Sequence, residues 1–167
     1  MTPKALVALC LCAGGAAASG RKIVTVPEWA PFTDYSHAVV GNGVVYVSGM
    51  VGYNMTTKED CASGPSNDDS GGDEGMQNQT RCMFENLARV LEVAGSSMDD
   101  VLSCSIQIAY GTCAFVSVID DMWKEYFPKD PPAQTSFTPY PVMKLPWHCD
   151  ENHDVYQMLT CQALVSS

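Results

Sequence analysis

The residues best suited to binding a metal ion gather in one polar stretch near the C-terminus, at His148, Cys149, Asp150, His153 and Asp154. Imidazole nitrogen and thiolate sulfur are ligands that Zn²⁺ prefers in proteins. The two histidines lie five positions apart without the helical periodicity that would bring their rings together, and no second cysteine is nearby in the sequence. We therefore predict no metal site, and we interpret the stretch as an exposed polar insertion whose Cys149 forms a disulfide with Cys113 or Cys61.

Two serines, Ser48 and Ser136, have side chains that can act as nucleophiles. A nucleophilic serine needs an adjacent general base, and the sequence places no histidine and carboxylate beside either one. His37 lies in a run that favours a β-strand, so we interpret it as a buried, hydrogen-bonded histidine rather than as a general base. The residues alone leave the catalytic groups undefined.

The charge of the chain argues against one class of partner. Its 167 residues include 9 Lys and Arg against 19 Asp and Glu, a formal net charge of −10. Proteins that bind nucleic acids present basic stripes to the phosphates, and this sequence has none, so we predict no nucleic-acid partner. No stretch reaches the roughly 18 apolar residues that cross a bilayer, so we predict no membrane partner either.

The N-terminus predicts export. Residues 1–18 combine Lys4, a short apolar run and three alanines before Ser19, which is typical of a secretory signal peptide. Asn54 and Asn78 each begin a glycosylation sequon, and removal of the signal peptide leaves six cysteines. We expect a protein secreted or held in the lumen of the secretory pathway, with residues 19–167 forming one domain and with disulfides among Cys61, Cys113 and Cys149. Cys104 and Cys161 lie in apolar strands, where buried free thiols are common, so we do not expect all six cysteines to pair.

Hydrophobic periodicity indicates the elements that would position these groups. Apolar residues repeat at helical spacing between Met76 and Gly95, and Gly95 is suited to end that helix. On its polar side, Arg81, Glu85 and Arg89 are spaced to pair along the helix. The second helix is expected at residues 113–127. We expect strands at residues 22–26, 36–40, 44–48, 101–110, 133–138 and 155–165, with a tight hairpin turn at Asn42-Gly43 and glycines 49 and 52 at close backbone contacts.

These elements follow the order βββαβαββ, which predicts an α+β fold: a mostly antiparallel six-stranded sheet with two helices on one face. Two segments interrupt the pattern, residues 53–75 and 143–154, and we interpret both as insertions. The first is acidic and rich in Gly and Ser, so we expect a solvated loop rather than a calcium site.

Several short runs carry a resemblance. They are Tyr35-Ser36-His37-Ala38, residues 43–49 (GVVYVSG), Gln79-Thr80-Arg81 with Glu85-Asn86-Leu87, residues 91–100 (LEVAGSSMDD), residues 123–127 and Pro132-Ala133. Together, in order and at fitting distances over most of residues 22–165, they resemble the Rid/YjgF family of reactive intermediate deaminases. The resemblance implies a chorismate-mutase-like (YjgF-like) fold, a homotrimer with small-molecule pockets between subunits, no cofactor, and hydrolysis of 2-imino or enamine acids to 2-keto acids and ammonia.

Matching positions to the family's motifs carries over a ligand pocket formed by Tyr35, Ser48, Gly49, Asp120, Gln134, Ser136 and Met158. Gln134 stands where the family has the arginine that grips the substrate carboxylate, and an uncharged amide cannot replace that charge-assisted pair. Met158 stands where the family has a glutamate that orders the hydrolytic water, and a thioether cannot activate water. Ser136 replaces a cysteine, and Asp120, in place of an asparagine, repels an anionic substrate.

We therefore expect a small-molecule-binding protein of this type, with an intersubunit cleft and with the imino-acid and enamine deaminase activity lost or weak. Two alternatives remain open. One is an active deaminase that holds its substrate through backbone amides and Gln134, and the other is a structural or partner-binding protein with an empty pocket.

Overall fold

The structure is a computed structural model that describes residues 20–29, 35–59, 61, 73–108, 113–139 and 157–166. Its elements are β1 (Lys22–Val24), β2 (Ala38–Gly41), β3 (Val44–Val47), β4 (Met50–Val51), α1 (Asp73–Ala94), the 3₁₀ turn η1 (Met98–Asp100), β5 (Val101–Ile108), α2 (Cys113–Tyr126), β6 (Ala133–Pro139) and β7 (Gln157–Leu164). The predicted signal peptide, Cys149 and the insertion at residues 143–154 lie outside the described residues.

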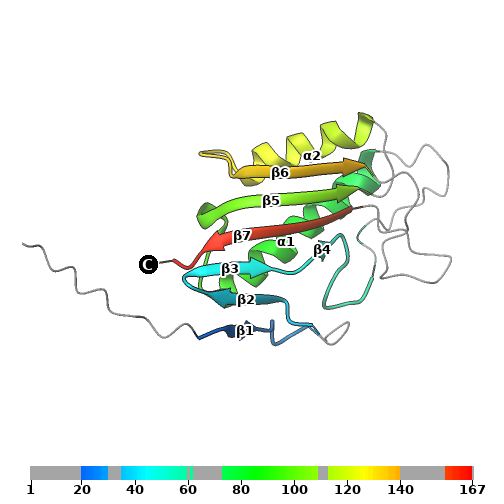
Figure 1. Ribbon diagram of the computed structural model, residues 1–167. Helices are drawn as coiled ribbons and strands as arrows, with labels where there is room; N and C mark the ends of the chain where they lie inside the picture. Colours follow the sequence, from blue (N-terminus) through cyan, green and yellow to red (C-terminus); the bar gives the residue numbers. More distant parts are fainter. Residues whose placement is uncertain are drawn as a thin grey trace, which may run out of the picture.

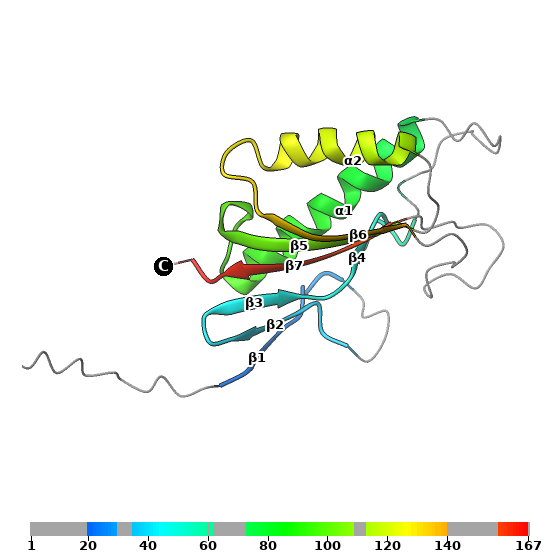
Figure 2. The same ribbon diagram turned by 45° about the horizontal axis from the view of Figure 1, so that its top comes forward.

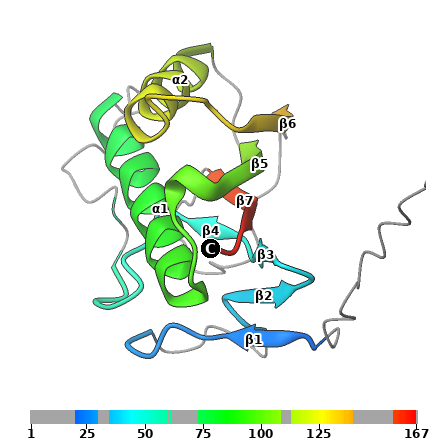
Figure 3. The same ribbon diagram turned by 90° about the vertical axis from the view of Figure 1, so that its left-hand side faces the viewer.

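All the strands that the structure describes belong to one sheet, in the order β1-β2-β3-β7-β5-β6, and β4 also pairs with β7. Every pair is antiparallel except β5 with β6. Both helices lie on one face of the sheet, and its other face is left open by the described residues (Figures 1 and 3). The predicted α+β fold is confirmed. The sheet has seven strands rather than six, because the segment after Gly49 pairs with β7 as a separate short strand.

The predicted central helix is α1. It begins at Asp73, three residues before the expected Met76, and ends at Ala94. Gly95 has φ of +82° and donates its N–H to the carbonyl of Glu92, while Ser96 donates to Leu91, which is the Schellman arrangement that ends many helices. The expected apolar stripe faces the sheet, with Met83, Leu87, Val90 and Leu91 fully buried.

The second helix packs against the first rather than along the centre of the sheet. Figure 2 shows α2 over the β6 edge with α1 beside it. Phe84 of α1 stacks on Tyr126 with ring centroids 4.7 Å apart, and Ile119 of α2 is fully buried. This packing closes one end of the hydrophobic core.

The predicted hairpin turn and the predicted close contact at Gly52 both occur. Asn42 and Gly43 have φ of +52° and +77°, which the tight β2–β3 hairpin requires. A Cβ added at Gly52 would lie 2.6 Å from the Cβ and the carbonyl oxygen of Gln79, so only glycine lets this segment lie directly on α1.

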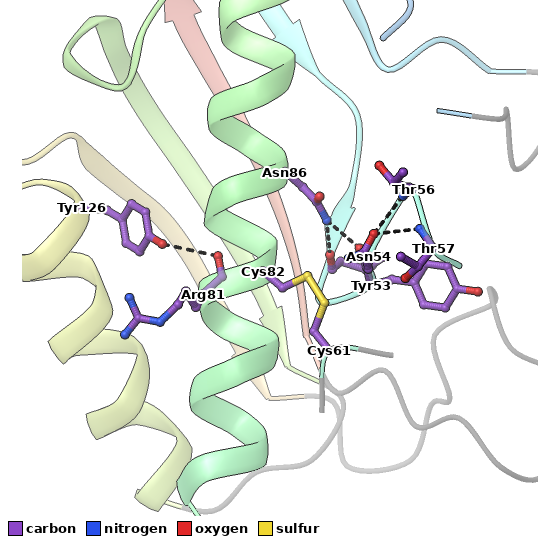
Figure 4. The surroundings of a disulfide bond; sticks show 10 residues. Tyr53, Asn54, Thr56, Thr57, Cys61, Arg81, Cys82, Asn86 and Tyr126 are labelled. Atoms are coloured by element: carbon purple, nitrogen blue, oxygen red, sulfur yellow. Dashed lines mark hydrogen bonds between the residues drawn. A yellow bond between two sulfur atoms is a disulfide. The ribbon is translucent and has the colours of Figure 1, made fainter. Parts of the chain in front are cut away.

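The disulfides differ from those predicted. Cys61 pairs with Cys82 of α1, not with Cys149 or Cys113, because the segment around Tyr53 and Cys61 lies against that helix (Figure 4). Cys104 of β5 and Cys161 of β7 form a second disulfide, although their apolar strands suggested buried free thiols. They are directly opposite each other in the sheet, a proximity that strand-level prediction does not reveal.

The predicted ion pairs along α1 are also wrong. Arg81 pairs with Glu125 of α2 at 2.6 Å, and Arg89 pairs with both Glu28 and Glu92 at 2.6 Å. Two tertiary neighbours, Glu125 and Glu28, and one residue of α1 itself, Glu92, therefore take the place of the partner Glu85 that spacing alone suggested.

Candidate functional site

The residues carried over as a pocket lie in two separate groups within one chain. Tyr35, Ser48 and Gly49 flank β2, β3 and β4, and Met158 of β7 joins them. Gln134 and Ser136 lie on β6 at the far edge of the sheet, while Asp120 is exposed on α2. We call the first group the β4 side and the second the β6 side, and the open face of the sheet lies between them.

On the β4 side, Gly49 and Met158 are in direct contact. A Cβ added at Gly49 would lie 2.4 Å from Sδ and 3.0 Å from Cγ of Met158, so the missing side chain is what makes room for the methionine. Val51 and Gln107 are opposite Met158 on the neighbouring strands. The place predicted for a water-ordering group is therefore filled by a thioether and methylene groups.

Among the residues that the structure describes, no basic side chain forms a hydrogen bond with the Ser48 hydroxyl. Its hydroxyl donates to the carbonyl of Ser36 at 2.6 Å, and its backbone N–H donates to the carbonyl of His37 at 3.0 Å. The Nδ1 atom of His37 is itself occupied, because it accepts the N–H of Val26. Ser48 therefore ties two segments of the chain together and is not activated as a nucleophile.

On the β6 side, strand register separates Gln134 from Met158. Gln134 is opposite Cys104, whereas Met158 is opposite Gln107, which in turn is opposite Thr138. The four steps along the strand from Gln134 to Thr138 span roughly 13 Å. Within one chain the two positions do not meet, and the exposed Gln134 has only uncharged donors to offer a ligand.

The residue in line with Ser136 is one that sequence analysis missed. Ser136 is opposite Ser105, and Ser105 is opposite Thr160 of β7. The side chain of Ser136 lies outside the described set. Thr160, like Met158, carries no carboxylate, so a shift of the family's register by two residues would not restore the missing glutamate.

The open face of the sheet holds a shallow hollow of about 160 Å³. Its lining is neutral, with polar side chains from three strands: Tyr46, Ser103, Ser105, Thr160 and Gln162. The alternation of polar and apolar residues in β5 and β7 indicated a solvent-facing side, but it could not show that the polar sides of β3, β5 and β7 would meet. The hollow can donate and accept hydrogen bonds, and it carries no charged side chain.

His37 is buried, as predicted. Its Nδ1 accepts the N–H of Val26 at 2.8 Å, and the edge of the Trp29 ring meets it with centroids 5.2 Å apart and planes at 78°. Burial lowers the pKa of His37 from its ordinary value. A neutral imidazole is the form that this geometry requires, because a protonated Nδ1 cannot accept a hydrogen bond.

The two sequons have different surroundings. Asn54 lies in an exposed turn, where its Oδ1 accepts the N–H groups of Thr56 and Thr57 at 3.0 and 2.9 Å (Figure 4). Asn78 is exposed on α1, but the hydroxyl of its sequon partner Thr80 is buried, donating to the carbonyl of Met76 and accepting from Gln157. Only the first sequon has its Asn and Thr both at the surface.

Within the described ranges, no three His, Cys, Asp or Glu side chains come together as metal ligands. The polar stretch at residues 148–154, for which we predicted no metal site, lies outside those ranges. Neither α1 nor α2 combines the length and the apolar character needed to cross a bilayer.

A family model and two known proteins match most of the chain. Residues 26–148 match the family model described as endoribonuclease L-PSP. The "RutC family protein UK114" of Drosophila melanogaster is 29% identical over 148 residues, 88% of this chain and 91% of that protein. The "2-iminobutanoate/2-iminopropanoate deaminase" of Dermatophagoides farinae is 30% identical over 119 residues, 71% of this chain and 83% of that protein.

Solved structures agree on the fold. An Entamoeba histolytica protein described as an endoribonuclease L-PSP superposes with a TM-score of 0.64 at 27% identity, covering 87% of this chain and 99% of that one. RidA from an Antarctic Psychrobacter also superposes with a TM-score of 0.64, at 22% identity, covering 86% and 98%. With the family model matched over most of its length, the chain belongs to the Rid/YjgF family, which includes the reactive intermediate deaminases.

Proposed function

We propose that the protein binds a small uncharged molecule in a cleft formed between copies of the chain, and that its activity on 2-imino or enamine acids is lost or weak. The observation that carries this proposal is the contact of Met158 with Gly49, which leaves hydrocarbon and sulfur at the position to which the family resemblance assigns a water-ordering carboxylate. A thioether accepts hydrogen bonds only weakly and cannot take a proton from water.

The second support is the missing cation. Gln134 is exposed on β6 and occupies the position that the family resemblance assigns to a carboxylate-binding arginine. An amide provides two neutral donors, whereas a guanidinium provides a two-pronged charge-assisted contact that is about twice as strong per hydrogen bond. A neutral ligand loses less from this replacement than an acid does.

The cleft requires a second copy of the chain. Gln134 and Met158 are well separated along the sheet of one protomer, so a ligand touching both positions must lie between protomers. The open face presents Tyr46 and Leu164, 48% and 46% exposed, and the tyrosine ring and the leucine side chain offer apolar surface that a neighbouring copy would cover. Together with family membership, these features support a homotrimer, and light scattering at several concentrations measures its mass.

The activity is tested by adding back the missing groups. The wild-type protein and the double variant Gln134→Arg/Met158→Glu are each mixed with freshly generated 2-iminopropanoate, and the decay of the imine is followed. We expect no acceleration over buffer for the wild type and roughly a hundredfold gain for the variant, the range of one general acid-base group. Gln134→Met/Met158→Gln is the matched control with altered size but no charge.

Wild-type acceleration well above buffer would contradict the loss of activity. It would favour the alternative that the protein is a working deaminase, for which the 30% identity to a mite protein named as such is the specific support. A further variant, Gln134→Arg/Thr160→Glu, distinguishes the two registers of β7, since Thr160 is the residue in line with Ser136. A pocket that takes up no compound in a thermal-shift screen of neutral and acidic metabolites would favour a structural role.

We also propose that the protein is secreted and glycosylated at Asn54. The exposed turn around Asn54 and the disulfide that ties Cys61 to Cys82 support this location, because disulfides persist in oxidising compartments. Expression of the full chain in a secreting eukaryotic cell should deliver it to the medium with a glycan that Asn54→Gln removes. Retention of the chain in the cytosol would refute secretion.

A further inference from the structure

His37 lies at the junction between the N-terminal segment, residues 20–29, and the candidate cleft. On one side its imidazole Nδ1 accepts the N–H of Val26, a residue with no exposed surface, and its ring meets Trp29 edge-on. On the other side its backbone carbonyl accepts the N–H of Ser48, whose hydroxyl also donates to the carbonyl of Ser36. One residue therefore connects the N-terminal segment to a residue of the cleft.

The bond from Val26 depends on the protonation state of the imidazole. Neutral His37 offers Nδ1 as an acceptor, whereas the protonated ring has an N–H at that atom, facing the N–H of Val26. Protonation thus removes a buried hydrogen bond, leaves two donors opposed and places a charge on a side chain that is only 4% exposed. The bound segment and the protonated ring are incompatible in this geometry.

The groups around His37 do not offset the cost of protonating its buried imidazole. The N-terminal segment contributes the Val26 amide, the Trp29 ring and one carboxylate, Glu28, which is held by Arg89 of α1 at 2.6 Å. The hydrogen bond from Arg89 lowers the pKa of Glu28, so this pair stays ionised throughout the range in which a histidine titrates. From the β3–β4 connection, Ser48 presents a neutral amide and hydroxyl. Burial is the cause that lowers the pKa of His37.

We propose that His37 is a pH-sensitive latch: protonation of its imidazole releases residues 24–29 from the sheet and loosens Ser48 at the candidate cleft. The cleft part of this inference rests on the proposed function, whereas the release of the N-terminal segment does not. The latch is closed at neutral pH and opens on acidification, the direction met by a protein that moves from a neutral to an acidic compartment.

The direction of the pH effect follows from linkage. The unfolded or released histidine has a pKa near 6.5, and the buried one has a lower pKa. The open state therefore binds the proton first, so the closed state is fully stable above about pH 6.5 and loses stability as the pH falls below it. Protection of the segment's backbone amides from hydrogen exchange should fall by up to about tenfold for each pH unit, until the pH reaches the pKa of His37 in the closed state.

Hydrogen–deuterium exchange on the intact protein tests the latch without any ligand. Peptides covering residues 22–29 and 44–50 are followed at pH 7.5, 6.5 and 5.5 after correction for intrinsic exchange, with the α1 peptide 83–94 as internal reference. We expect protection of the first two peptides to drop measurably at pH 5.5, by up to about tenfold, while the α1 peptide changes little. Equal protection at all three pH values would overturn the proposal.

A matched variant separates His37 from other groups that titrate in this range. His37→Asn keeps an acceptor near the position of Nδ1 but cannot be protonated there. We expect its exchange to be independent of pH, and an unchanged pH dependence in this variant would also overturn the proposal. Because wild-type exchange alone already tests the latch, a failure of the variant to fold leaves the proposal testable. Failure of the imine assay would refute only the proposed function.

Discussion

The two faces of the sheet are built from alternate residues of the same strands, yet they differ in how their groups are held. On the face covered by α1, Leu87, Leu91 and Leu159 are fully buried, and Asn86 binds the carbonyls of Val51 and Tyr53 at 3.0 and 2.8 Å. On the open face, Tyr46 and Leu164 are about half exposed beside a neutral hollow lined by serine, threonine and glutamine.

The difference indicates which face of the sheet is stabilised by contacts within a single chain. Two disulfides and the α1–α2 aromatic stack hold the covered side, so its stability is set within the protomer. The open side lacks such links among the described residues, and its exposed apolar groups suit contact with another copy. We expect substitutions on the covered side to act on folding and those on the open side to act on assembly.

The sharpest test of this contrast is a pair of leucine truncations. Leu87→Ala leaves a cavity beneath α1 and should lower the free energy of unfolding by about 2–5 kcal/mol. Leu164→Ala on the open face should lower it by less than about 1 kcal/mol in a dilute monomer. Urea unfolding followed by circular dichroism measures both, and equal losses at low protein concentration would break the comparison.

Removing the disulfides should have the next largest effect. By loop-closure entropy, replacing Cys104 and Cys161 together by alanine, across a separation of 57 residues, should reduce stability by about 4 kcal/mol. The same double replacement of Cys61 and Cys82, 21 residues apart, should reduce it by about 3 kcal/mol. Thermal unfolding without and with a reductant measures these differences. A wild-type protein whose stability is unaffected by reductant would contradict both values.

The smallest effect on stability is expected for substitutions on the solvent-facing side of the helices. Arg81 and Glu125 form an ion pair in which both side chains are more than two-fifths exposed, so water and salt screen it. Arg81→Gln and Glu125→Gln, alone and combined, should give a coupling energy below about 1 kcal/mol in a double-mutant cycle. A larger coupling would mean that the α1–α2 contact depends on charge as well as on its aromatic stack.

Local patterns predicted the elements well because each pattern has a local cause. The helical stripe gave α1 within three residues of its observed start, and the Asn-Gly dipeptide gave the β2–β3 turn because these residues tolerate positive φ. The partners of Cys61 and Arg81 were predicted wrongly, since both partners come from tertiary neighbours. Likewise, Thr160 was missed because strand register, not position in the sequence, aligns it with Ser136.

The sequence by itself determined the α+β class, the two helices and the absence of a charged pair at Gln134 and Met158, since composition and periodicity are properties of the chain. The tertiary structure alone decided that Met158 lies on Gly49, that His37 joins Val26 to Ser48, and that Cys104 meets Cys161. These contacts join residues far apart in the chain, and their register is set by packing the whole sheet against α1.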